Sequence, residues 1–196
     1  MMTHRRSGPP VSLASAHDII QLIEADSWMI EVLEAVDSVG PSGAWVAAGF
    51  VRNKVWDALH GYLRPSLLND VDVIYFDPKN HSVEPEMAFE SSLIEAMPLV
   101  PWSVRNQARM NQASSAPPAE GSLGAMRYWP ETATALAVCK RRDESMRFVS
   151  CYGLGDLLGL EVKPSPNFPI EVYRKRILAK DWLAIWPKLK IHGLTD

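Results

Sequence analysis

Two aspartates stand close together in a strongly apolar segment of the chain, and their spacing suggests metal chemistry. Asp70 and Asp72 belong to the run DVDVIYF, in which Asp72 lies between two valines. Residues two apart in a strand point to the same face, so both carboxylates project together, about 7 Å apart along the backbone. Adjacent carboxylates repel and are costly to desolvate unless a cation compensates them. A divalent ion with oxygen ligands, Mg²⁺ or Mn²⁺, suits this pair, and a solvated strand start explains it equally well.

A glycine upstream supplies a second component. The short apolar run 44–48 ends at Gly49, and the next residues, up to Tyr62, have helical spacing. Free N–H groups at the start of a helix suit a phosphate. The helix covers about 18 Å and the loop 63–69 reaches about 23 Å at most, so the glycine turn and Asp70 can lie side by side on antiparallel strands. This places phosphate donors beside metal carboxylates, as two-metal phosphoryl chemistry requires.

Four other polar residues are candidates for nucleotide contacts. Arg52 and Asn53 follow the glycine at the helix start, where a guanidinium can clamp phosphate oxygens. An ordinary first-turn pair that faces solvent is the alternative. Asn106 and Arg109 follow a predicted strand and are suited to contact a base, a sugar or an acceptor. Surface hydrogen bonding accounts for this second pair equally well.

The C-terminal segment 171–190 is basic in an otherwise slightly acidic chain. It carries six Lys and Arg residues against two acidic residues, while the whole chain has a net charge of -3. Arg176 and Lys180 are four residues apart and share a helix face, so they can reach a triphosphate or a polyanionic acceptor. A solvated helix face is the simpler explanation. The net charge argues against general DNA binding.

Strands and helices are interleaved along the chain, which predicts an α/β (α+β) fold with a mixed sheet flanked by helices. We expect residues 1–16 to be a disordered tail and 17–196 to form one domain. The domain begins with a helical pair over 17–38, in which Asp26 and Ser27 can cap the second helix. A flexible segment over 111–122 can cover a site. The strands expected are 44–48, 70–76, 102–106, 133–140, 146–152 and 160–164, and the further helices are 51–62, 84–97, 123–129, 153–158 and 171–186.

Composition excludes several classes of protein. The chain has 196 residues, 47% of them hydrophobic, enough for a sizeable core. It has no apolar run of about 18 residues, so we expect no membrane span. The N-terminal residues do not form a signal peptide, so we expect a cytoplasmic protein. Cys139 and Cys151 are too few for a disulfide framework and are expected to be reduced. The histidines have no zinc-ligand spacing, and no Walker-type loop is present.

Together these features resemble a known superfamily. An apolar strand, Gly49, a helix and then Asp70 to Val73 resemble the nucleotidyltransferases of DNA polymerase beta type. The blocks GFVRNKVWDALHG, NDVDVIYFD, WSVRNQARMN, YWPETATALAV and YGLGDLLGL are similar to one bacterial branch, nucleotidyltransferase family 6, formerly a domain of unknown function. The resemblance covers about residues 27 to 191. It implies a polymerase beta-like fold.

The superfamily pattern has a glycine followed by Gly or Ser, then the acidic pair, and a third carboxylate on a later strand. Gly49 matches the glycine, but Phe50 stands in place of the small residue, which puts close approach of a triphosphate in doubt unless its side chain turns into the core. No acid lies inside the predicted strands 133–140 and 146–152. Glu131 and Asp156 are the available substitutes for the third carboxylate, with Glu131 preferred because it stands at a strand entrance.

The resemblance implies an enzyme that transfers NMP from an NTP to a hydroxyl acceptor, which can be a small molecule, a protein or RNA. Asp70 and Asp72 would hold Mg²⁺ or Mn²⁺, and Glu131 would complete the catalytic set. Gly49, Phe50, Arg52, Asn53, Asn106, Arg109 and Lys180 would contact the nucleotide. The alternative is a nucleotide-sensing module with the same fold and no turnover, because an absent third carboxylate would remove the activation of the acceptor hydroxyl.

Overall fold

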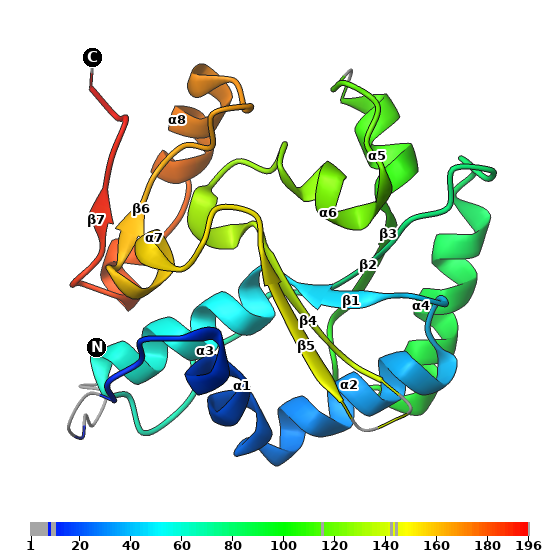
Figure 1. The fold of residues 1–196 in the computed structure, drawn as a ribbon, viewed down its shortest axis with the longest axis horizontal. Helices are drawn as coiled ribbons and strands as arrows, with labels where there is room; N and C mark the ends of the chain where they lie inside the picture. Colours follow the sequence, from blue (N-terminus) through cyan, green and yellow to red (C-terminus); the bar gives the residue numbers. More distant parts are fainter. Residues whose placement is uncertain (1–7, 9–10, 115, 142, 144, 196) are drawn as a thin grey trace.

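The chain folds around a five-stranded sheet, as seen in a computed structural model that describes residues 8, 11–114, 116–141, 143 and 145–195 (Figure 1). Most of the tail expected over 1–16 lies outside these residues. Where it is described, Gly8 donates its N–H to the carbonyl of Gly61 at 2.7 Å, and Ser15 caps the first helix. None of the described helices has the length and hydropathy that a bilayer crossing requires.

Helices and strands alternate along the chain as predicted. The helices are α1 (Ala16–Glu24), α2 (Ser27–Val39), α3 (Gly49–His60), α4 (Glu84–Ala96), α5 (Gln107–Ala113), α6 (Gly121–Met126), the 3-10 turn η1 (Thr132–Thr134), α7 (Gly155–Leu158), α8 (Ile170–Leu178) and α9 (Trp182–Ile185). The strands are β1 (Trp45–Ala47), β2 (Val71–Tyr75), β3 (Trp102–Asn106), β4 (Leu136–Lys140), β5 (Met146–Ser150), β6 (Glu161–Val162) and β7 (Lys190–Ile191).

The main sheet is mixed, as the sequence predicts, with the strand order β3-β2-β1-β4-β5. The central strand β1 is antiparallel to both β2 and β4, and β4 and β5 form an antiparallel hairpin. Strand β3 is parallel to β2, because α4 carries the chain across between them. A separate two-stranded parallel sheet joins β6 to β7 near the C-terminus. The antiparallel β1–β2 pair brings the end of β1 to the start of β2.

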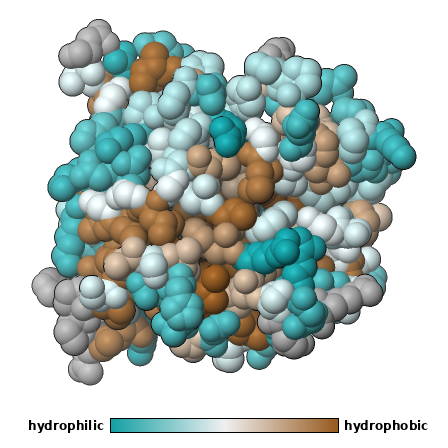
Figure 2. Space-filling view, in the orientation of Figure 1, coloured by the Kyte–Doolittle hydropathy of each residue, from teal (hydrophilic) through white to brown (hydrophobic). Residues whose placement is uncertain are grey.

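The two faces of the sheet have different roles. On β2, Val71 and Val73 are fully buried among the helices α1 to α4, in a hydrophobic cluster that extends from Ile19 to Leu189. Asp72 and Ile74 alternate with them and point to the opposite face. There Ile74 joins a small cluster that includes Met126 of α6. Asp72, the acidic residue of β2, therefore faces away from the main core. Figure 2 shows hydrophobic residues gathered in the middle of one side of the molecule, with hydrophilic residues around them.

The N-terminal helical pair forms as expected, and side-chain caps determine its boundaries. Ser15 and Asp18 form a reciprocal capping box, so α1 begins at Ala16, one residue before the predicted domain start. Asp26 caps α2 by accepting the N–H of Met29 at 3.2 Å, which agrees with the cap predicted at residues 26 and 27. Asp26 also pairs with Lys54 at 2.7 Å, which ties the helical pair to α3.

The predicted closing helix over 171–186 is wrong as one continuous element. Helix α8 ends at Leu178, and the short helix α9 begins at Trp182. The intervening turn lets Trp182 and Trp186 pack edge-on against Trp56, with ring centroids 5.5 Å and 5.2 Å away. Lys180 consequently lies in the turn and not on the helix that carries Arg176. Burial of two indole rings outweighs the helical propensity of this segment.

Three further elements differ from the prediction. Helix α5 covers residues 107–113, so the segment predicted as flexible over 111–122 begins as helix. The strand predicted from residue 133 begins instead at Leu136, because η1 precedes it. Strand β7 has only two residues and was not predicted. Such short elements depend on partners distant in sequence, which local periodicity does not report.

A single residue, Ala48, links β1 to α3, and its backbone is strained. Its φ is 50° and its ψ is -115°, a region that glycine adopts readily and alanine does not. The N–H of Ala48 donates to the carbonyl of Leu136 at 3.0 Å, which fixes this tight turn against β4. The turn therefore needs a positive φ at position 48, and Gly49 follows it as the first residue of the helix.

We predict that Ala48→Gly raises the free energy of unfolding by about 1 kcal/mol, because it removes the strain of a Cβ at positive φ. Urea denaturation of the two proteins measures the difference. Ala58→Gly in the same helix is the control and should lower the free energy by about 1 kcal/mol, because that position is ordinary helix. A loss of stability in Ala48→Gly similar to that of the control would contradict the prediction.

Candidate active site

A cavity of about 640 Å³ lies on the face of the sheet to which Asp72 points. Five parts of the chain line it: the β1–α3 turn, the loop before β2, the β3–α5 junction, the segment around residues 129–134, and the C-terminal segment from α8 to Trp186. Figure 1 shows where these elements lie around the sheet. The lining includes Gly49, Arg52, Asn53, Asp70, Asp72, Arg105, Gln107, Trp129, Arg176, Lys180 and Trp182.

Asp70 and Asp72 both line this cavity, at the start of β2. Asp70 is exposed and Asp72 is half-buried. Burial and, second, the neighbouring charge of Asp70 together raise the pKa of Asp72 to about 6, against the opposing effect of Arg52, Arg105 and Arg176. Among the described residues, neither carboxylate has an ion-pair partner within 4 Å. The cavity thus holds two neighbouring acids whose charges are not neutralised.

The start of α3 brings the phosphate candidates to the same cavity. No side chain caps this helix, so its first N–H groups remain available. Arg52 is only 8% exposed, and its Nε and Nη2 donate to Asn53 Oδ1 at 3.2 Å and 2.8 Å. Its guanidinium lies 4.5 Å from the ring centroid of Trp182 and 5.2 Å from that of Trp56.

Arg52 is a buried cation without a carboxylate partner. Burial lowers its pKa to about 10, and the described residues offer no acid within 4 Å of its guanidinium. Stacking on the two indole rings compensates part of the desolvation. A buried cation that keeps its charge is stabilised by an anion, and a phosphate oxygen meets this requirement.

Phe50 does not line the cavity. Its side chain is 1% exposed in the main core, and its ring centroid is 5.9 Å from that of Trp28. The bulky ring therefore does not obstruct the turn, which answers the doubt raised by the sequence. The positive φ lies at Ala48, directly before Gly49. A Cβ on Gly49 would meet Arg52 Nη2 at 3.5 Å, so this residue faces the guanidinium directly.

Lys180 lines the cavity, whereas Glu131 does not. Burial lowers the pKa of Lys180, as do the charges of Arg176 and Arg52. Glu131 is fully buried, accepts from Arg176 Nε at 2.7 Å and from Thr134 Oγ1 at 2.8 Å, and so is fixed beside the cavity. The other candidate for the third carboxylate, Asp156, binds Thr132 and Lys163 outside the cavity.

The strands beside β2 supply no third acid either. The partners of Asp72 in the register are Ala47 and Ser103, and Arg105 is the partner of Ile74 on β3. Within the described part of the chain, no group of three His, Cys, Asp or Glu side chains could hold a metal ion. Two carboxylates form an all-oxygen donor set, which suits a divalent ion that takes its other ligands from phosphate and water.

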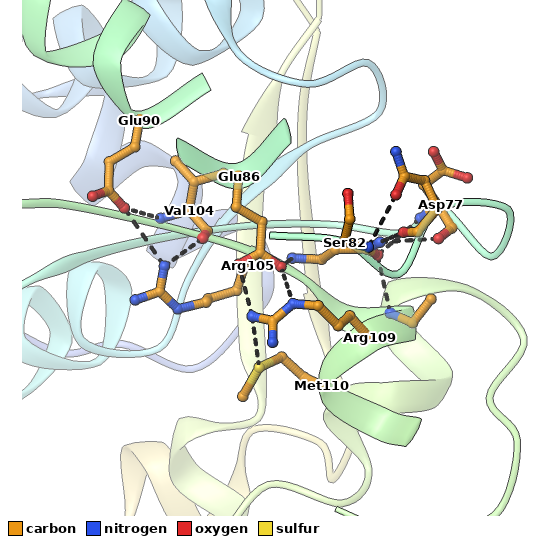
Figure 3. Close-up of polar contacts among 11 residues, drawn as sticks. Asp77, Ser82, Glu86, Glu90, Val104, Arg105, Arg109 and Met110 are labelled. Atoms are coloured by element: carbon orange, nitrogen blue, oxygen red, sulfur yellow. Dashed lines mark hydrogen bonds and ion pairs between the residues drawn. The ribbon is translucent and has the colours of Figure 1, made fainter. Parts of the chain in front are cut away.

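The structure does not bring Asn106 and Arg109 to the cavity. Arg109 makes a bidentate pair with Glu86 of α4, with both distances 2.7 Å, as Figure 3 shows. Asn106 is fully buried, and its amide bonds the backbone of Asp77, Asn80 and Ala108. Arg109 therefore ties α5 to α4, and the Asn106 side chain ties the start of α5 to the loop between β2 and α4.

Two carboxylates of α4, those of Glu86 and Glu90, cover the outer edge of β3. Glu86 Oε1 accepts the N–H of Asn106 at 2.9 Å, and Glu90 Oε2 accepts the N–H of Val104 at 3.0 Å (Figure 3). Arg105 lies 3.5 Å from Glu90 and donates to the Val104 carbonyl. Side chains therefore satisfy donors that an edge strand would otherwise leave open.

Sequence reasoning missed a buried residue that shapes the cavity floor. Asp57 of α3 accepts from the N–H and the hydroxyl of Ser66, in the loop before Asp70, and from Trp186 Nε1 at 2.7 Å. It is 5% exposed. One carboxylate thus holds together three of the segments that line the cavity. The sequence signal that could have identified Asp57 is an acidic residue on the apolar side of a predicted helix.

Comparison with known proteins adds four findings. A family model described as nucleotidyltransferase matches residues 34–191. No curated protein matches the chain. An NMR structure described as revealing a CCA-adding enzyme head domain is 29% identical, with a TM-score of 0.80 over 91% of this chain and 96% of that one. A tRNA-processing enzyme in an apo form is 17% identical, with a TM-score of 0.49 over 94% of this chain and 46% of its own, too distant to bear on function.

We predict that Asp72→Asn stabilises the protein at pH 8 by about 1–3 kcal/mol, since the wild type must hold an ionised Asp72 beside Asp70. The raised pKa means that the folded state binds the proton more tightly than the unfolded state. The free energy of unfolding that the wild type loses relative to the variant is therefore largest above about pH 6. This loss shrinks as the pH falls towards 3.8, the ordinary pKa of an aspartate. Denaturation at several pH values measures the difference, in which all other titrating groups cancel. A variant less stable than the wild type at pH 8 would refute the prediction.

Proposed function

The chain belongs to the nucleotidyltransferase family, and from this premise we propose that it transfers NMP from an NTP to a hydroxyl acceptor with Mg²⁺ or Mn²⁺. One observation carries the proposal. Two carboxylates, Asp70 and Asp72, line the same cavity as the uncapped start of α3 and the cation Arg52, and none of these three side chains has an ion-pair partner in the described part of the chain. Acids for a metal and cations for phosphates are the two components that phosphoryl transfer requires.

The chain's residues have separable roles in this proposal. Asp70 and Asp72 would hold the divalent ion, which would supply positive charge against the triphosphate and the leaving pyrophosphate. The N–H groups after Ala48, with Gly49 leaving room for them, would hold the terminal phosphates together with Arg52 and Lys180. Asn53 orients the Arg52 guanidinium.

The proposed reaction forms one bond to phosphorus and breaks another, and it needs no oxidant or reductant. The acceptor oxygen forms a bond to the α-phosphorus, the bond from that phosphorus to the bridging oxygen breaks, and pyrophosphate leaves. The hydroxyl proton passes to water. Glu131 enters as a positioning residue, because it holds Arg176 at the cavity wall. Catalysis then rests on orientation and charge stabilisation.

A nucleic acid hydroxyl is the first acceptor to test. The solved structure that is 29% identical is described as a CCA-adding enzyme head domain, and CCA is a run of nucleotides. A small-molecule or protein hydroxyl is the alternative. The lack of a third carboxylate among the residues around Asp72 favours a second candidate function, a nucleotide sensor without turnover.

Binding of Mg²⁺–NTP should raise the melting temperature by about 5 °C or more at a concentration 100-fold above Kd. We predict that Asp70→Asn and Asp72→Asn each abolish this increase, measured against their own nucleotide-free proteins by differential scanning fluorimetry. Asp77→Asn, at the far end of the same strand, is the matched control and should retain it. Stabilisation that survives in both site variants would overturn the metal–nucleotide site. Pyrophosphate release in the presence of RNA then separates the enzyme from the sensor.

Arg52→Met should lower Mg²⁺–ATP affinity at least tenfold without lowering the melting temperature of the free protein. The substitution removes a buried charge that forms no ion pair with any described residue, and it keeps an apolar side chain against Trp182. Isothermal titration gives the affinity, and a thermal scan gives the stability. Unchanged affinity would remove Arg52 from the phosphate site, and a large loss of stability would show that its role is structural.

A further inference from the structure

Gln107 is a cavity residue that the proposed reaction does not yet use. It is the first residue of α5, directly after β3, and it is 5% exposed while lining the cavity. The helix that carries it is fixed on one side by the Arg109–Glu86 pair, which Figure 3 shows, and at its start by the Asn106 cap. A side chain on this support has a defined position.

Trp129 determines which way the Gln107 amide faces. Trp129 Nε1 donates to Gln107 Oε1 at 3.2 Å. An indole nitrogen can only donate, so the amide must present its oxygen to Trp129 and its NH₂ group elsewhere. Gln107 Nε2 donates to no acceptor among the described residues. It is not one of the fully buried polar atoms that lack a hydrogen-bond partner, so a ligand can reach it. Gln107 therefore offers hydrogen-bond donors to the cavity.

Gln107 and the phosphate residues lie at opposite ends of the cavity floor. Asp70 and Gly49 stand where β2 starts and β1 ends. Ile74 lies two residues beyond Asp72 on the same face, about 7 Å further along the strand. Gln107 follows Asn106, which is the register partner of Tyr75, so it lies further along in the same direction.

The geometry of in-line displacement indicates which end of the cavity the acceptor would occupy. The attacking oxygen must approach the α-phosphorus from the side opposite to the leaving pyrophosphate. If Gly49 and Arg52 hold the leaving phosphates, the attacking hydroxyl comes from the side of Ile74 and Gln107. That end of the cavity is lined by the half-buried Trp129 ring and the thioether of Met110, surfaces on which a flat ring can stack.

We propose that Gln107 and Trp129 form the acceptor subsite and bind the base of a nucleoside that carries the attacked hydroxyl. Gln107 Nε2 donates to a carbonyl oxygen or ring nitrogen of that base, and Trp129 both orients the amide and supports the ring. This inference rests on the proposed function and names its acceptor as a nucleoside. The nucleoside can be free or can be the 3′ end of an RNA.

Gln107→Glu tests the subsite because its carboxylate can still accept from Trp129 while the donors are lost. The probes are an eight-nucleotide RNA, the same RNA with an abasic 3′ end, and a free ribonucleoside, each with Mg²⁺ and all four NTPs. We expect the KM for the intact RNA or the ribonucleoside to rise at least tenfold, with the KM for NTP within twofold of wild type. The abasic RNA should be used equally by both proteins. Gln112→Glu, an exposed residue on the same helix, is the control and should match the wild type.

The outcomes separate this inference from the function on which it rests. Stabilisation by Mg²⁺–NTP should be the same in the wild type and in Gln107→Glu, which also shows that the variant folds. If the wild type binds NTP but extends neither RNA nor ribonucleoside, the acceptor assignment falls while nucleotide binding stands. A rise in the KM for NTP alone would place Gln107 against the incoming nucleotide and overturn the subsite. If no NTP stabilises the wild type, the proposed function itself fails.

Discussion

Opposite charges share one cavity in this protein without neutralising one another, and the fold keeps them in that state. Asp70 and Asp72 lie on β2, while Arg52 is buried in α3 against two indole rings, and none of these groups has an ion-pair partner among the described residues. Direct pairing across the cavity would satisfy the charges and close the site. The rigid sheet and the stacked tryptophans instead hold the carboxylates and the guanidinium apart, which is the arrangement that the proposed ligand, a cation with phosphates, requires.

The scaffold around the cavity depends on buried polar residues as much as on apolar packing. Asp57 connects α3, the loop before β2 and the C-terminal tryptophan through three hydrogen bonds to one carboxylate. Arg176 is anchored by the fully buried Glu131. Because both carboxylates are buried, loss of one partner would leave a buried charge less satisfied and loosen a wall of the site.

Local patterns predicted the mixed sheet, the helical pair and the strand with its acidic pair, because alternation and capping are properties of neighbouring residues. The strand predicted at 102–106 matches β3 in the structure. Sequence alone did not show that the side chains of Asn106 and Arg109 are already bonded, since their partners Asp77, Asn80 and Glu86 lie 23 to 29 residues earlier in the chain. Gln107 was missed for the same reason, because its orientation depends on Trp129. The strain at Ala48 was hidden because alanine gives no signal of a positive φ.

The covered edge of β3 has a consequence for association between molecules. An open edge strand can add a strand from another chain, which leads to sheet extension and aggregation. Here Glu86 and Glu90 occupy the outward N–H groups of Asn106 and Val104, and both carboxylates lie beside an arginine. A foreign strand would have to displace two charged side chains to pair at this edge. Glu86, which also anchors α5 through Arg109, and Glu90 therefore protect this edge of the sheet against pairing with another chain.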